Sequence, residues 1–256
     1  MKEIRFTSFP AMSYAGGEAI NTLCTNLTFS GHNVKKIMIS SCHASEGKTT
    51  VSMNVMRTMA KLGKRVVLVD GDLRRSTIIK HFGARFPEGE ENLGLTHLLA
   101  GMAAEEEVLY DTGLDGACVV PVTKTVRNSL PLLNSEKMRQ LLDWLAQYFD
   151  YVIIDAPPIG ALIDAAQIAR YCDGILLVVN YNAISRKELA DAKLQLEQTG
   201  CPVLGTVINQ AAFDSYLNRK YYYKSYYYNY YYYGSYGGPD SPRRRGLGGL
   251  FARKKK

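Results

Sequence analysis

The chain has 256 residues, which is enough for one large domain plus a terminal extension. Its five cysteines are odd in number and scattered, which excludes a disulfide framework and favours a reducing compartment. No run approaches the roughly 18 consecutive apolar residues of a membrane-spanning helix, and the first residues lack the apolar stretch of a signal peptide. We therefore expect a cytoplasmic protein.

The net charge of +7 is unevenly distributed. Residues 217–256 hold ten basic residues and one acidic residue, Asp240, for a net charge of +9. Residues 1–216 hold 21 basic and 23 acidic residues, for a net charge of −2. A basic tail on a near-neutral body indicates nucleic-acid binding less strongly than a basic folded face does, so we expect no nucleic-acid partner.

The first 34 residues are weakly patterned and predict an N-terminal arm with one helix around residues 17–27. From residue 35 onward, short apolar runs recur that do not alternate with polar residues. This pattern is typical of strands buried on both faces of a sheet. The runs cover residues 35–41, 65–70, 117–122, 151–156, 174–180 and 202–209.

Longer segments with helical periodicity lie between these runs. They predict helices from residue 51 to Gly63, from Ser135 onward, and over residues 185–200. The alternation of strand and helix predicts an α/β domain over residues 35–216. Its core should be a doubly wound, mainly parallel sheet with helices on both faces.

The stretch "IMISSCHASEGKTT" (37–50) has the order of a phosphate-binding loop: a buried strand, small residues, then Gly-Lys-Thr-Thr opening a helix. Backbone N–H groups at such a helix start face phosphate oxygens. Lys48 would reach the β and γ phosphates, and the Thr49 hydroxyl would ligate Mg²⁺. Cys42 stands where the consensus has its first glycine, so the alternative is a helix start with a chance Gly-Lys-Thr.

Two further predicted strands end in acidic residues. Asp70 ends the second run and is followed by Asp72, Arg74 and Arg75, and Asp155 lies at the end of the fourth. Because the carboxyl ends of parallel strands meet at the ligand crevice, these carboxylates are expected beside the phosphate loop. There they can hold Mg²⁺ or its water shell, and one can accept a hydroxyl proton. The alternative is that each caps a helix, but three of them beside a Gly-Lys-Thr loop favour nucleotide binding.

The C-terminal segment is dominated by tyrosine. Residues 220–238 contain eleven tyrosines, and Tyr216 lies just upstream. Aliphatic neighbours are missing, and Gly, Ser, Pro and Asn interrupt the aromatic residues, so these side chains do not have the pattern of a packed core. We therefore predict that residues 217–256 are disordered when nothing is bound.

Together these motifs resemble the bacterial tyrosine kinases, in particular the stand-alone cytoplasmic type that accompanies capsule and exopolysaccharide export. "SSCHASEGKTT" is similar to the family's Walker A motif, "VVLVDGDLRR" to Walker A′, "VIIDAPP" to Walker B, and the tail to its tyrosine cluster. The resemblance covers nearly the whole chain. It implies a P-loop NTPase-type fold and an ATP-dependent protein-tyrosine kinase that autophosphorylates its C-terminal cluster and regulates capsular or exopolysaccharide synthesis.

The resemblance also implies a role for each site residue, with ATP and Mg²⁺ as cofactors. Lys48 would stabilise the transferring phosphoryl group, Asp70 or Asp72 would orient or deprotonate the acceptor hydroxyl, and Arg74 would lie on the acceptor side. Asp155 completes the catalytic set. The nucleotide-binding residues are Ser45, Glu46, Gly47, Lys48, Thr49, Thr50 and Asn209, and the metal ligands are Thr49, Asp70 and Asp155. The phosphoacceptors are Tyr216, Tyr221, Tyr222, Tyr223, Tyr226, Tyr227, Tyr228, Tyr230, Tyr231, Tyr232, Tyr233 and Tyr236.

The resemblance implies partners as well. Stand-alone members work with a transmembrane polysaccharide co-polymerase that activates them, so we expect recruitment to the inner face of the cell membrane, and a protein-tyrosine phosphatase as a second partner. A ring-forming helix in the family often reads Glu-x-x-Arg-x-x-Arg. Here Glu18 matches, but Asn21 and Cys24 replace the arginines, which predicts weakened self-association.

Two alternative functions remain open from the sequence. An ATPase switch of the ParA/MinD kind shares the sheet and the three motifs, but it carries a lysine where this chain has His43 and lacks a tyrosine tail. A nucleic-acid or membrane-binding module would use the basic tail and stack its tyrosines on bases. That reading requires neither Lys48 nor the three aspartates.

Overall fold

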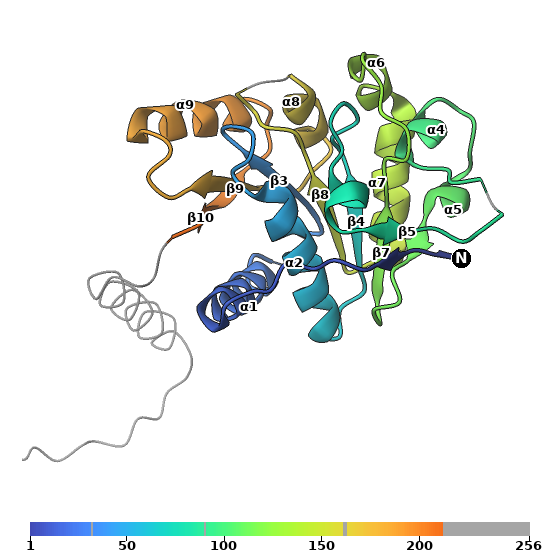
Figure 1. The fold of residues 1–256 in the computed structure, drawn as a ribbon. Coiled ribbons are helices and arrows are strands. Elements are labelled where there is room, and N and C mark those ends of the chain that lie inside the picture. Colours follow the sequence, from blue (N-terminus) through green and yellow to red (C-terminus); the bar gives the residue numbers. More distant parts are fainter. Residues whose placement is uncertain (32, 90, 161–162, 212–256) are drawn as a thin grey trace, which may run out of the picture. The chain divides into compact units, whose positions relative to one another are not determined.

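The computed structural model describes residues 1–31, 33–89, 91–160 and 163–211. Its centre is an eight-stranded sheet with the strand order β1-β6-β7-β4-β8-β3-β9-β10 (Figure 1). The strands are β1 (Lys2–Glu3), β3 (Lys36–Ser41), β4 (Val66–Asp70), β6 (Tyr110–Asp111), β7 (Ala117–Val120), β8 (Tyr151–Asp155), β9 (Gly174–Asn180) and β10 (Val203–Asn209). All neighbours run parallel except β6 and β7, which confirms the predicted mainly parallel sheet.

All six predicted apolar runs form strands of this sheet. Four of these strands are one residue shorter than the predicted run, and the largest difference is at β7, which ends at Val120 rather than at residue 122. Pro121 follows directly, and proline has no N–H group to continue a strand ladder. Its carbonyl instead accepts a hydrogen bond from the backbone of Leu95, at the start of a helix.

Helices cover both faces of the sheet, as predicted. They are α1 (Tyr14–Thr28), α2 (Lys48–Lys61), α3 (Ile78–His81), α4 (Leu95–Leu99), α5 (Glu105–Val108), α6 (Leu130–Leu133), α7 (Glu136–Tyr148), α8 (Asp164–Ala169) and α9 (Arg186–Glu197). Among the described residues, no helix is long and apolar enough to cross a membrane.

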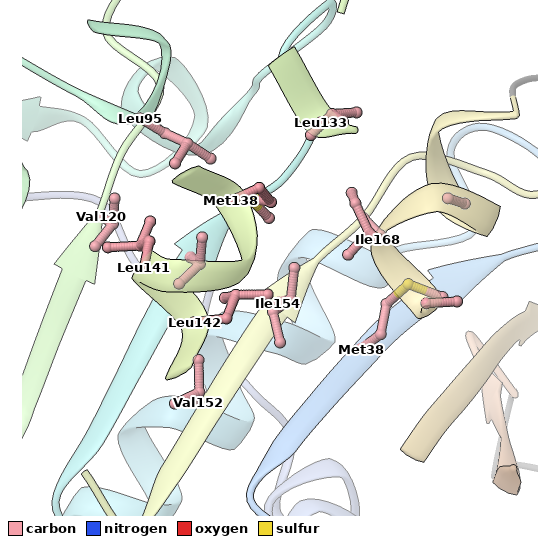
Figure 2. Packing of buried hydrophobic residues seen from close by; sticks show 14 of the residues in the cluster. Met38, Leu95, Val120, Leu133, Met138, Leu141, Leu142, Val152, Ile154 and Ile168 are labelled. Carbon is pink, nitrogen blue, oxygen red and sulfur yellow. The ribbon is translucent and has the colours of Figure 1, made fainter. Parts of the chain in front are cut away.

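Two separate hydrophobic cores explain why the strands lack polar alternation. Successive strand side chains point to opposite faces, so Met38 of β3 packs in the core under α7 and α8, whereas Ile37 and Ile39 pack in the core under α1 and α2. Figure 2 shows the first core, where Leu141 and Leu142 of α7 lie over the sheet. Because both faces are covered, the middle residues of the central strands are apolar on both sides, as in Val66–Val69 of β4.

The strand order positions the site. The chain leaves β3 through α2 and enters β4 two places away, and β8 later fills the place between them. β9 and β10 lie on the other side of β3. The chain therefore winds in opposite directions from β3, and the carboxyl ends of β3, β4 and β8 share one edge of the sheet.

The N-terminal segment contains more structure than its weak pattern indicates. Besides the expected helix, α1, it contributes β1 to the main sheet and pairs β2 (Arg5–Phe6) antiparallel with β5 (Ala84–Arg85). Ile4, between these strands, is fully buried. Strands of two residues are too short to produce a periodic signal, so sequence reasoning missed them. The domain boundaries at residues 34 and 216 stay predictions, and the tail at 217–256 lies outside the described residues.

Candidate active site

The loop between β3 and α2 has a backbone that only certain residues tolerate. Gly47, directly before the first helical residue, has a φ of 86°. A Cβ atom at this position would lie 2.1 Å from Asn209 Nδ2. Ser45 also has a positive φ, of 65°. The glycine of the Gly-Lys-Thr motif is therefore required both by its left-handed conformation and by the close approach of Asn209.

Two of the predicted nucleotide-binding residues hold this loop in shape. The buried Glu46 carboxylate accepts hydrogen bonds from the backbone N–H groups of His43, at 2.7 Å, and Asn180, at 3.3 Å. The Glu46 carbonyl accepts a hydrogen bond of 2.9 Å from Asn209 Nδ2. Besides the contact with His43 within the loop, the loop is therefore held by the last residues of β9 and β10, Asn180 and Asn209.

The acidic residues converge as predicted. Asp70 of β4 and Asp155 of β8 are direct partners in the strand register. Asp70, Asp72 and Asp155 are 1%, 7% and 2% exposed, respectively. Lys48 Nζ lies 3.9 Å from Asp72 Oδ2. The structure therefore brings the phosphate-loop lysine and the three carboxylates together at one edge of the sheet.

Burial and mutual repulsion perturb these carboxyl groups. Burial, followed by the charge of Asp155, raises the pKa of Asp70 to about 8, although a hydrogen bond of 2.5 Å from Ser76 Oγ opposes this shift. Burial also raises the pKa of Asp155, and the charge of Lys48 is the largest opposing effect. The folded site thus favours the protonated form of these two acids, and Lys48 offsets only part of the cost of ionising them.

The side-chain oxygens of this site fit Mg²⁺ if phosphate oxygens of a bound nucleotide and water complete the coordination. Among the described residues, no three His, Cys, Asp or Glu side chains are arranged to hold a metal ion. Mg²⁺ typically uses one or two carboxylates together with water and substrate phosphates. The Thr49 hydroxyl and the carboxylates of Asp70 and Asp155 are hard oxygen donors of this kind, and an added divalent cation would offset their surplus charge.

Comparisons with known proteins agree with this geometry. A family model described as "AAA domain" matches residues 34–198. The tyrosine-protein kinase CpsD of Streptococcus pneumoniae is 39% identical over 193 residues, covering 75% of this chain and 83% of that protein. The chain belongs to the bacterial tyrosine-protein kinase family. This membership confirms the predicted enzyme class, a protein-tyrosine kinase.

Solved structures of this kinase family show the same fold. The kinase domain of Escherichia coli tyrosine kinase ETK has a TM-score of 0.69 at 32% identity, covering 77% of this chain and 78% of that one. The chimerical protein CapA2B2 gives 0.71 at 26% identity, covering 81% and 92%. The Pyrococcus furiosus cell division ATPase MinD gives 0.57 at 26% identity, covering 71% and 74%. The fold is thus shared with the alternative class of ATPase switches.

Arg74, predicted on the acceptor side of this kinase, is bonded to buried groups. Its Nε donates to Asp164 Oδ2 at 2.8 Å and to Ser129 Oγ at 2.7 Å. Asp164 is 1% exposed and Ser129 is fully buried. These contacts anchor the segment after Asp72 to α8, and the role of Arg74 at the acceptor stays a prediction.

Sequence reasoning missed several residues that support the site. They are Ser52, which donates to Asp155 Oδ1 at 3.2 Å, together with Ser76, Ser129, Asp164 and Asn180. Only Ser52 carried a usable signal, since it lies one helical turn after Lys48 and shares its side of α2. The others come from loops and strands whose proximity depends on the fold.

Proposed function

We propose that the protein transfers the γ-phosphoryl group of ATP, bound with Mg²⁺, to tyrosine hydroxyls of its own C-terminal cluster. The observation that carries this proposal is the convergence of Lys48 with Asp70, Asp72 and Asp155 in a chain with a dozen clustered tyrosines. The tyrosines lack the pattern of a core, and their hydroxyls are chemically suited to act as acceptors. The relatives of this chain are named tyrosine-protein kinases, which also supports tyrosine as the residue that accepts the phosphoryl group.

The proposed reaction uses the residues as follows. Backbone N–H groups at the start of α2 bind the phosphates, and Lys48 offsets charge on the transferring group. Thr49, Asp155 and Asp70 would hold Mg²⁺, which would neutralise charge on the phosphate oxygens. The tyrosine oxygen bonds to the γ phosphorus, the bond to the β–γ bridging oxygen breaks, and ADP leaves.

Asp72 is our candidate for the group that takes the tyrosine proton. It is the most exposed of the three carboxylates, at 7%. All three carboxylates have partners: Asp70 accepts from Ser76 Oγ and the backbone of Asp72, and Asp155 accepts from Ser52. Asp72 accepts from the backbone of Arg75 at 2.9 Å and lies 3.9 Å from Lys48 Nζ. Asp72 also lies two residues beyond the end of β4, at the carboxyl edge of the sheet.

We further propose that this phosphorylation regulates capsular or exopolysaccharide synthesis, with a transmembrane co-polymerase recruiting and activating the kinase at the inner face of the membrane. A protein-tyrosine phosphatase would remove the phosphate from the tail.

The α1 contacts are consistent with weakened self-association: Asn21 donates to Glu18 of its own helix at 3.2 Å, and Cys24 is fully buried against α2. Neither side chain offers a neighbouring subunit the bidentate fork of an arginine.

The test measures ADP and phosphotyrosine together in purified protein given ATP and Mg²⁺. We expect both from the unaltered chain and neither from Lys48→Met, with unchanged circular dichroism, because Lys48 contributes charge rather than packing. ADP formation without phosphotyrosine would instead identify an ATPase switch. Phosphotyrosine at the normal rate in Lys48→Met, in a preparation free of other kinases, would refute the assignment of the site.

A further inference from the structure

A cavity of about 270 Å³ lies at the other end of α2, beneath the segment that precedes α1. Phe9, Pro10 and Met12 of that segment form one wall, and Arg57 and Lys61 of α2 form part of the other. Figure 1 shows this segment running past α2 into α1. At a rise of 1.5 Å per residue, Arg57 is about 14 Å along the helix from Lys48, so the cavity is separate from the phosphate loop.

The Arg57 guanidinium has no anionic partner among the described residues. Its Nε is buried and has no hydrogen-bond acceptor in the described part of the chain. Its carbon centre lies 4.1 Å from the centroid of the Phe9 ring, which offers only the face of an aromatic system. By contrast, Arg65 and Arg74 each face a carboxylate at 2.8 Å. Within the described residues, no carboxylate therefore offsets the positive charge of Arg57.

The cavity indicates which anion. Arg57 and Lys61 supply two positive charges and Thr58 supplies a hydroxyl, and no acidic residue lines the cavity in the part of the chain that the structure describes. A guanidinium binds a phosphate through two parallel hydrogen bonds. A phosphotyrosine carries −1.5 to −2 charges at neutral pH, which two cations match and a single carboxylate does not.

The opposite wall fits the remainder of such a side chain. Pro10 and Met12 present apolar surface on which an aromatic ring can lie, beside the Phe9 ring that already holds Arg57. We propose that this cavity binds a phosphotyrosine side chain, presented by the C-terminal cluster of another copy of the chain. The proposal rests on the proposed autophosphorylation for the source of that group. It makes the phosphorylated tail a ligand as well as a product.

The test uses the full chain carrying Lys48→Met, which keeps the protein from modifying itself or the probe. The probe is a fluorescent peptide of residues 226–236 with phosphate installed chemically on Tyr230. Binding is followed by fluorescence anisotropy. Matched probes carry the unmodified tyrosine or a glutamate at the same position.

We expect the phosphopeptide to bind at least ~10-fold more tightly than either matched probe. The unmodified tyrosine lacks the charge-assisted contact, and glutamate brings only one negative charge and no aromatic ring. Arg57→Ala should weaken binding ~10-fold or more, and Arg57→Lys should weaken it less because charge is kept. Lys61→Ala should weaken it roughly 3-fold. Lys193→Ala, which removes an exposed lysine of α9, should leave binding unchanged.

Three outcomes would overturn the proposal: no preference for the phosphopeptide, equal binding of the glutamate peptide, or full binding by Arg57→Ala. Because Arg57 also packs on Phe9, a melting curve accompanies each variant. If Arg57→Ala is not folded, Lys61→Ala and Arg57→Lys decide. The phosphate is supplied chemically, so failure here speaks against the cavity and leaves autophosphorylation to its own test.

Discussion

The two ends of helix α2 carry cations in opposite situations. At the first residue, Lys48 lies 3.9 Å from Asp72 and close to two further buried carboxylates. Near the last turn, Arg57 and Lys61 line a cavity that no acid lines within the described residues. At the first end, the protein itself supplies the carboxylate that faces the lysine. At the second end, Arg57 and Lys61 have no acidic residue beside them in the cavity lining. We therefore assign this end to the binding of an anionic ligand rather than to catalysis.

The first way to break this comparison is to remove charge from the catalytic end. Asp155→Asn should lower the rate of phosphotyrosine formation by ~10²–10³-fold, the loss typical when a positioned electrostatic group is removed from an active site. Asn keeps the shape and accepts the hydrogen bond from Ser52, so the fold should persist. Initial rates at saturating ATP and Mg²⁺ measure the effect, and a loss under ~5-fold would remove Asp155 from the catalytic set.

The second way is to alter the turn that starts α2. Gly47→Ala should lower nucleotide affinity by at least ~10-fold, because a left-handed non-glycine residue costs about 1–3 kcal/mol and its Cβ would lie 2.1 Å from Asn209 Nδ2. Gly63→Ala is the matched control, since Gly63 has a φ of +75° and nothing within 4 Å. Equal nucleotide binding by both variants, measured by calorimetry, would contradict a specific role for the Gly47–Asn209 contact.

The third way tests the cost of placing acids side by side. Asp70→Asn should abolish activity and yet raise the melting temperature at neutral pH by roughly 3–6 °C without nucleotide or metal. It removes an acid whose pKa is raised to about 8 by burial and by the charge of Asp155, and such a group destabilises the fold above its unfolded pKa. Asn can still pair with Ser76 and with the backbone of Asp72. Differential scanning fluorimetry in chelator measures the change. A lower melting temperature would show that the Asp70 charge stabilises the fold.

The same contrast explains what the sequence could predict. The six buried strands and the long helices have apolar patterns that can be recognised within a short stretch of sequence. The catalytic end of α2 follows from the Gly-Lys-Thr motif and from the acidic residues at strand ends. Short elements such as β1 and α8 contain too few residues for a periodic signal.

The partners of Arg74 and the cavity at Arg57 were not predictable in this way. Ser129 and Asp164 lie 55 and 90 residues from Arg74 along the chain. Phe9 reaches Arg57 because the N-terminal segment is held by two-residue strands. Contacts of this kind depend on the completed fold, and nothing in the local sequence marks them.

The most direct test of the central claim maps the phosphate. The unaltered chain is incubated with ATP and Mg²⁺, beside Lys48→Met mixed with the unaltered chain, and phosphotyrosines are located by mass spectrometry. We expect phosphate on tyrosines between residues 216 and 236, including those of the Lys48→Met chain, which can receive it only from another copy. Turnover of ATP with these tyrosines unmodified, or with phosphate confined to residues elsewhere, would contradict the account.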